Sequence, residues 1–204
     1  MENKVSQFKS ILKSVDSEFK DKGSKFIAYI FPISSEEEIK NHIDNLKSQH
    51  SGAAHFCYAF RLGINGEIYR ANDDGEPSGS AGKPILNQLL SFEVTNILAV
   101  VVRYFGGTKL GVSGLINAYK EATNFALSNA KIITKDITFS VKIVYPYDLT
   151  NEINQLLNLY QAQIINQSFS IDCQQLIAIS IKYKSDVEKH FSSIEHLGLK
   201  FEFV

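Results

Sequence analysis

The sequence has no tryptophan, one methionine, four prolines and only two cysteines, and these scarcities exclude several classes of protein. Cys57 and Cys173 lie far apart in the sequence, which argues against a disulfide framework. No apolar run approaches the roughly 20 residues of a membrane helix, and the longest, residues 97–102, has the length of a strand. The metal-binding patterns HExxH and CxxC are also absent, so we expect neither a bound metal nor a cofactor.

Excess charge is missing too, because 21 basic residues stand against 22 acidic ones. Residues 1–135 carry 16 basic and 14 acidic residues, whereas residues 136–204 carry 5 and 8. A broad basic field of the kind that binds nucleic acid is therefore absent, and an anion site must depend on local geometry in the first part. The first residues contain no apolar signal region, so we expect a cytoplasmic protein that is not bound to a membrane.

The first part of the chain alternates strand and helix patterns. Residues 10–15 and 24–33 are predicted strands joined by a charged turn at 19–23. Ser34 and Ser35 before three glutamates predict a helix that ends near residue 49. Residues 54–62 alternate as a strand, and Asn65-Gly66 predicts a hairpin into a short strand at 67–70.

Apolar spacing predicts the elements that follow. Ile85, Leu86, Leu89 and Leu90 have helical spacing, and residues 97–104 form a near-continuous apolar run, as in a central strand covered on both faces. Residues 112–129 are predicted to form a helix with one apolar face. The residues expected on that face are Leu115, Ala118, Ala122, Phe125 and Ala126.

The remaining residues follow the order βαββαβ, which is typical of a ferredoxin-like domain. Strands are predicted near 137–145, 163–170, 174–183 and 199–204, with helices near 148–160 and 185–197. Residues 131–135 are the predicted linker. We therefore expect an α+β protein of two domains, residues 1–135 and 136–204.

The most informative segment is the glycine-rich acidic loop at residues 73–84. Ser78 or Ser80 is predicted to cap the following helix, so that N–H groups around Gly82, with Lys83 beside them, either bind an anion or only complete the cap. The segment does not match a phosphate loop, because Pro77 and Pro84 occupy two of the required positions. The acids Asp73, Asp74 and Glu76 could instead hold a divalent cation, although their spacing is not that of an EF-hand.

A second glycine-rich segment, residues 103–114, follows the apolar strand. Arg103 needs solvent, a partner carboxylate or a ligand, because an unpaired buried charge costs free energy. It could pair with Asp73 or Asp74, or bind a ligand. Further candidate anion-binding residues are Gly106, Gly107, Lys109 and Arg61.

His55 and Cys57 share one strand face, which raises the possibility of a cysteine nucleophile. Side chains two apart on a strand point in parallel, and strand cysteines are usually small buried apolar residues. We therefore expect Cys57 to have a packing role.

Two long motifs resemble the signature of the YigZ/IMPACT family, in particular of its bacterial branch. One is DDGEPxGxAGxPIL, beginning at Asp73, and the other is VRYFGGxKLG, beginning at Val102, followed by Gly114-Leu115 and Ala118-Tyr119. The segment from Glu18 to Phe26 also resembles the opening of the family's domain. With the ferredoxin-like second domain, the resemblance covers nearly the whole chain.

The resemblance implies that the first domain is βαβ in character, like the second domain of certain small-subunit ribosomal proteins and domain IV of elongation factor G. The second domain would resemble domain V of that factor. The family's eukaryotic member is similar to a translational regulator, so the resemblance implies association with RNA or the ribosome. One departure is Asn117, where the family commonly has an arginine, which removes a positive charge.

Three functions remain open from the sequence. The first is a translation-associated regulator that binds RNA or the ribosome through a cleft between the two glycine-rich loops, and this binding should weaken strongly with salt. The second is an enzyme for a small anionic substrate, with Asp74 or Glu76 as the general base. The third is an adaptor that binds a protein through the second domain, acting in stress regulation.

Overall fold

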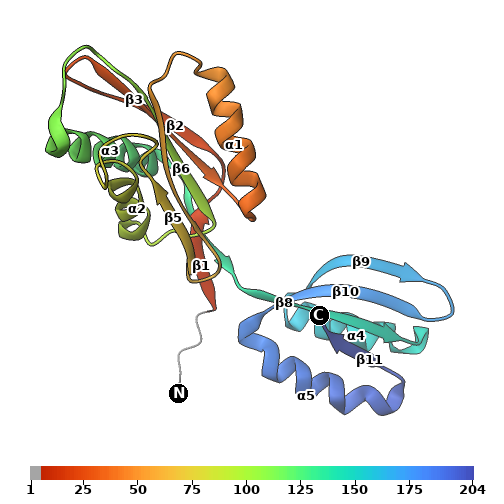
Figure 1. The fold of residues 1–204 in the computed structure, drawn as a ribbon. Helices are drawn as coiled ribbons and strands as arrows, with labels where there is room; N and C mark the ends of the chain where they lie inside the picture. The colour runs from red at the N-terminus through yellow and green to blue at the C-terminus, as the bar shows by residue number, and fades with distance from the viewer. Residues whose placement is uncertain (1–5) are drawn as a thin grey trace. The chain divides into compact units, whose positions relative to one another are not determined.

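The computed structural model describes residues 6–204, which fall into two compact units (Figure 1). Phe8–Lys135 form the first unit, and Asp136–Val204 form the second together with Ser6 and Gln7. Helices and antiparallel sheets occur in both units, which confirms the predicted α+β class.

The first unit is built on a five-stranded sheet with the order β2-β3-β6-β4-β5. Its strands are β2 (Val15–Asp21), β3 (Ser24–Pro32), β4 (His55–Leu62), β5 (Ile68–Asn72) and β6 (Ile97–Tyr104). Because β3 and β4 both pair antiparallel with β6, they are parallel to each other, and α1 (Glu36–Gln49) connects them. Similarly, β5 and β6 both pair antiparallel with β4, and α2 (Gly82–Ser91) connects them.

Both faces of the central strand β6 are covered, as its continuous apolar run predicted. Ile97, Ala99 and Val101 belong to the core that contains residues of α2 and α3 (Gly111–Asn129). Leu98, Val100 and Val102 belong to the core that contains Ile39 and Leu46 of α1. The polar side chain of this strand that carries a charge, Arg103, stands near its C-terminal end and is buried as well.

The start of α1 agrees with the sequence prediction. The Ser35 hydroxyl accepts a bond from the N–H of Glu38, and the Ser34 hydroxyl donates to the Glu38 carboxylate at 2.5 Å. Three glutamates in the first turn complement the positive end of the helix dipole.

The structure differs from the sequence predictions for the first unit at four places. The predicted strand at 10–15 is instead β1 (Gln7–Ile11), and the residues from Phe19 to Asp21 lie in β2, so the turn contains only Lys22 and Gly23. The predicted linker is the strand β7 (Ile132–Asp136), which pairs with β1, because Ile132, Ile133 and Thr134 are β-branched and favour extended backbone. Phe125 is 53% exposed, and Tyr119 is buried on the inner face of α3 instead.

The second unit has the sheet order β11-β8-β10-β9, which is the predicted ferredoxin-like arrangement. Its strands are β8 (Thr138–Tyr145), β9 (Gln163–Phe169), β10 (Cys173–Ser180) and β11 (Lys200–Phe203). Its helices are α4 (Thr150–Leu159) and α5 (Lys184–Ile194), with short 3₁₀ turns η1 (Tyr147–Leu149), η2 (Ile181–Tyr183) and η3 (Glu195–Leu197). A core of its own includes Val141, Ile177 and Phe191.

Candidate functional site

The carboxylate of Asp73 closes the glycine-rich loop onto the start of α2. Its Oδ1 accepts from the N–H of Ala81 at 3.0 Å and of Gly82 at 2.8 Å, and its Oδ2 accepts from the N–H of Gly79 at 2.9 Å. The first N–H groups of a helix have no partner inside the helix, so an acceptor here stabilises both the helix and the loop. Asp73 is thus an anion that the chain supplies for itself.

The predicted serine cap of α2 was wrong. The residue at the N-cap is Ala81, whose side chain cannot accept a bond; Ser80 is fully buried and donates to the carbonyl of Pro77 at 2.6 Å, whereas Ser78 is exposed. The N–H of Gly82, expected to face an anionic ligand, is engaged by Asp73.

Replacing Asp73 with asparagine should lower the free energy of unfolding by about 1 kcal/mol at pH 7, the usual worth of a helix cap. Burial raises the pKa of Asp73, but the hydrogen bonds from the N–H groups of Gly79, Gly82 and Ala81 together lower it by more. The pKa of Asp73 is therefore below its ordinary value. A lowered carboxyl pKa gives stability that is present above the unfolded value and lost as the pH falls through the folded value.

The difference between wild type and Asp73→Asn should therefore shrink as the pH falls below about 4. Urea unfolding monitored by circular dichroism from neutral to acidic pH measures it. Asp44→Asn, at an exposed position of α1, is the matched control and should stay within about 0.5 kcal/mol of wild type. A difference that does not change with pH would contradict this role for Asp73.

A buried ion pair lies where the two glycine-rich segments meet. Arg103 Nη1 donates to Glu76 Oε1 at 2.5 Å, and the Tyr119 hydroxyl donates to the same oxygen at 2.8 Å. The side chains of Glu76 and Arg103 are 4% and 7% exposed. The partner of Arg103 is therefore Glu76, not Asp73 or Asp74 as the sequence had suggested.

Aromatic rings complete the surroundings of Arg103. Its guanidinium carbon lies 5.5 Å from the centre of the Phe26 ring and 5.7 Å from that of Phe105, within the range of cation–π attraction. Its Nε is buried and has no hydrogen-bond partner among residues 6–204. Arg103 thus joins the acidic loop at residues 73–84 to β3 and β6. Very little of its side chain is exposed, so little of it is accessible to an anion in solution.

His55, Asp74 and Cys57 lie close to the ion pair of Glu76 and Arg103. His55 Nδ1 lies 2.8 Å from the Asp74 carbonyl oxygen, and its Nε2 is 3.9 Å from Glu76 Oε1. Asp74, whose φ is positive at 42°, accepts from the N–H of Phe56 at 2.6 Å. Both carboxylates named as possible general bases therefore make bonds inside the chain.

Cys57 is fully buried, as its strand pattern indicated. Its sulfur lies 3.0 Å from the Asp73 carbonyl oxygen and 3.3 Å from the Tyr119 hydroxyl. Burial raises the pKa of the Cys57 thiol and also that of Tyr119, so both groups are held neutral. Cys57 is therefore a poor nucleophile.

Two of the glycines are required by close contact between backbones. A Cβ built on Gly106 would lie 1.9 Å from the carbonyl carbon of Gly23, and one on Gly82 would lie 2.5 Å from the nitrogen of Asn72. Gly107, in contrast, has φ of 85° and open space around it. The contact at Gly106 fixes the loop after β6 against the turn between β2 and β3.

Exposed residues lie on the turn between β2 and β3 and on the loop after β6. Lys22, Lys109 and Gly107 are exposed, and Phe105 is 54% exposed. Lys83 is also exposed, in the first turn of α2. Neither Lys22 nor Lys109 makes an ion pair with any residue from 6 to 204.

Arg61 lies away from this region. It pairs with Ile97 at the start of β6, whereas His55 pairs with Arg103 near its end, so about 20 Å of strand separates the two arginines. Its guanidinium donates to the carbonyls of Val94 and Asn65. The structure therefore gives Arg61 a role in holding loops at the opposite end of the sheet.

Sequence reasoning missed the contribution of Tyr119. Its hydroxyl connects Glu76 with Cys57, from helix α3. The signal was present, because Ala118-Tyr119 belongs to the motif that suggested the family. The motif alone did not indicate this role, because the predicted apolar face of α3 included Phe125, which is exposed, and omitted Tyr119, which is buried.

The described residues, 6–204, lack two further features. They contain no group of three or more His, Cys, Asp or Glu side chains placed to hold a metal ion. No helix among them has both the length and the apolar character needed to span a membrane.

Comparison with known proteins places this region in a recognised domain. The family model of the Impact N-terminal domain matches residues 22–127, which include both glycine-rich segments. The chain is 42% identical to IMPACT family member YvyE of Bacillus subtilis over 56% of its own length and 52% of that protein. It is 35% identical to IMPACT family member YigZ of Escherichia coli, over 72% of this chain and 74% of the relative.

A crystal structure described only as that of a hypothetical protein has a similar fold, and the match covers nearly the whole chain. The TM-score is 0.73, the identity is 27%, and 98% of each chain is covered. Both units of the fold are therefore shared with that protein.

Proposed function

The chain belongs to the IMPACT family, and from this premise we propose that it is a translation-related regulator that binds RNA or the ribosome through its first unit. The motifs that identify the family lie at the junction of the two glycine-rich segments, which the matched domain includes. The proposed contact surface consists of Lys22, Phe105, Gly107 and Lys109, here called the loop-end surface.

The observation that carries the proposal is the pairing of exposed cations with an exposed aromatic ring on two loops that are fixed against each other. Lys22 adjoins Gly23 and Phe105 adjoins Gly106, and the two glycines are in backbone contact. Lysines supply phosphate contacts, and an exposed ring offers a surface on which a base can stack. A rigid support lowers the entropy lost on binding.

The buried residues of the site have a supporting role in this proposal. Asp73 holds the acidic loop to α2, and the pair of Glu76 and Arg103 joins that loop to β6. We therefore assign ligand binding to the exposed lysines and not to Arg103 and Gly82, which the sequence had suggested. With few cations, binding should be modest in affinity and sensitive to salt.

Replacing Lys22 and Lys109 together with alanine should weaken binding of the full chain to ribosomes and to single-stranded RNA. Each phosphate contact to a single strand contributes about 0.7 to the salt slope, so the slope should fall by about 1.4. Co-sedimentation with ribosomes and filter binding of RNA, at about 50 to 200 mM salt, measure both quantities.

The matched control is Lys13→Ala with Lys131→Ala, which removes the same charge at the other end of the unit. The carbonyl of Lys131 accepts from the N–H of Leu12, so these lysines are neighbours, and β2 separates them from Lys22 by about 20 Å. Binding that does not depend on salt, or an equal loss in both double variants, would refute the loop-end surface.

A further inference from the structure

Among residues 6–204, the strand β9 forms one edge of the sheet in the second unit, and its sequence gives that edge little protection. All seven of its residues are exposed, and none is charged or proline. Ile164, Ile165 and Phe169 are 47%, 56% and 56% exposed, and Ile171 just beyond the strand is 91% exposed. Unpaired backbone groups beside apolar side chains favour the addition of another strand.

The opposite edge of the same sheet shows the usual protection. Strand β11 has only four residues, and Lys200 and Glu202 are exposed charges on it. The β9 edge has one protective feature, a shift of register opposite Leu176 and Ile177 of β10. From Asn166 to Phe169 the register is unbroken.

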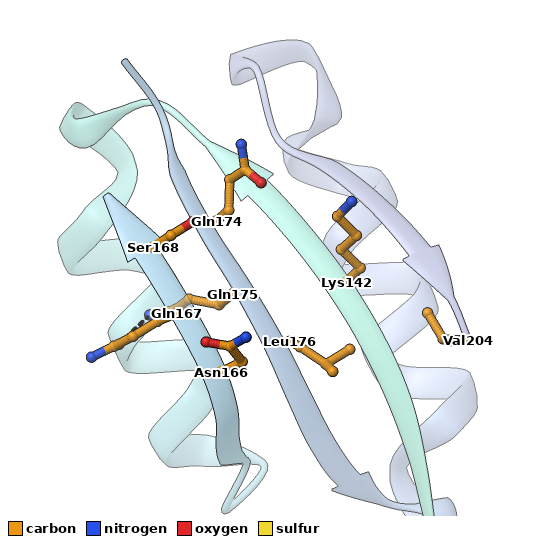
Figure 2. A pocket seen from close by; sticks show the side chains of 8 residues that line it. All are labelled: Lys142, Asn166, Gln167, Ser168, Gln174, Gln175, Leu176 and Val204. Atoms are coloured by element: carbon orange, nitrogen blue, oxygen red, sulfur yellow. Dashed lines mark hydrogen bonds between the residues drawn. The ribbon is translucent and has the colours of Figure 1, made fainter. Parts of the chain in front are cut away.

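The two faces of β9 differ in polarity. Phe169 and Gln167 pair with Cys173 and Gln175, which are buried on the helix side, whereas Ser168 and Asn166 pair with Gln174 and Leu176. On this second face the strand borders a shallow groove of about 300 Å³, where Ser168 lies beside Gln174 and Asn166 lies beside Leu176 (Figure 2). A strand added to β9 would continue this polar face.

We propose that β9 pairs antiparallel with β9 of a second copy of this chain, around a two-fold axis at Gln167. Neighbouring side chains of a strand point to opposite faces, so a two-fold axis perpendicular to the sheet must place one residue opposite its own copy. The two four-stranded sheets then become one continuous sheet.

The axis at Gln167 matches side chains of the same character. Within the unbroken register, Asn166 meets Ser168 of the other copy and Gln167 meets Gln167, whose amide can both donate and accept. Ile165, the residue at the register shift, comes opposite Phe169. An axis at Asn166 would instead place Ile165 opposite Gln167 and Ile164 opposite Ser168. Because β9 has no charge, two copies meet without like charges in contact.

Charge outside the strand gives the association a salt dependence opposite to that of RNA binding. Residues 136–204 carry 5 basic and 8 acidic residues, so two copies of the second unit repel weakly at long range. Added salt screens that repulsion and should strengthen the dimer, whereas it weakens phosphate contacts.

Sedimentation velocity of the full chain over a range of concentrations tests the proposal. The wild type should show a dimer fraction that rises with concentration and with salt. Gln167→Lys and Gln167→Glu should each weaken association several-fold, because each places like charges opposite one another. An equal mixture of the two variants should restore it by forming mixed dimers.

The matched control is Gln155→Lys, the same change at an exposed position of α4, which should leave association unchanged. Circular dichroism of each variant checks that its fold is intact. A wild type that remains monomeric, a dimer that Gln167→Lys does not affect, or a mixture that does not associate would each overturn the proposal.

Discussion

Replacing Glu76 with glutamine should lower the free energy of unfolding by about 3 kcal/mol, because Arg103 then keeps a buried charge without a counter-charge. Glutamine has nearly the same shape and could still accept from Tyr119, so the effect reports mainly the loss of charge. Urea unfolding monitored by circular dichroism measures it.

A second substitution separates the charge from the packing. In Glu76→Gln with Arg103→Met the buried cation is gone, and the stability should recover in part, since no buried charge is left without a counter-charge. Glu37→Gln, at an exposed position in the first turn of α1, is the control and should cost no more than about 1 kcal/mol, the usual worth of a charge at a helix N-terminus. A double variant no more stable than Glu76→Gln would contradict this account.

The buried pair also affects how a binding experiment on Arg103 is interpreted. Arg103→Ala removes the partner of Glu76 and contacts with Phe26 and Phe105, so it should disturb the fold of both loops. A loss of RNA binding in that variant would not identify a contact residue. The exposed lysines Lys22 and Lys109 provide the cleaner test.

Replacing Gly106 with alanine should destabilise the protein by about 3 kcal/mol and weaken ribosome binding. The new Cβ would lie 1.9 Å from the carbonyl carbon of Gly23 and 2.2 Å from the nitrogen of Ser24, so the two loops must separate. Overpacking against side chains typically costs about 1–3 kcal/mol, and backbone atoms can yield less. Thermal unfolding and co-sedimentation with ribosomes measure the two effects.

Gly107→Ala is the matched control one residue further on. Its Cβ would meet nothing within 4 Å, and the cost should be limited to about 1 kcal/mol for a left-handed backbone conformation with φ of 85°. If both alanine variants were equally stable, the contact between Gly106 and Gly23 would not be what fixes the loop-end surface.

Much of the fold could be predicted because local patterns and long-range packing agree. The apolar run of β6 indicated a strand covered on both faces, and the spacing in residues 136–204 gave the ferredoxin-like order. Predictions failed where local chemistry was ambiguous. The charged residues of β2 resemble a turn by composition, and their alternation is visible only against the paired strand β3.

The roles of the candidate site residues differ from those that the sequence suggested. Sequence motifs brought attention to Glu76, Arg103 and Asp73, and the structure places all three at one end of the sheet. The serine cap was wrong, since a carboxylate eight residues before Ala81 reaches the same N–H groups more effectively. The prediction that Arg61 belongs to the site was wrong. Arg61 and Arg103 lie on adjacent strands, β4 and β6, but near opposite ends of them.

The sequence by itself determined the α+β class, the family and the position of the candidate site, because periodicity, turn residues and long motifs are properties of local chain order. Only the tertiary structure decided which acid neutralises Arg103, which anion occupies the start of α2, and why Gly106 must lack a side chain. Each of these depends on atoms far apart in the chain, and burial makes one pairing far more stable than the alternatives.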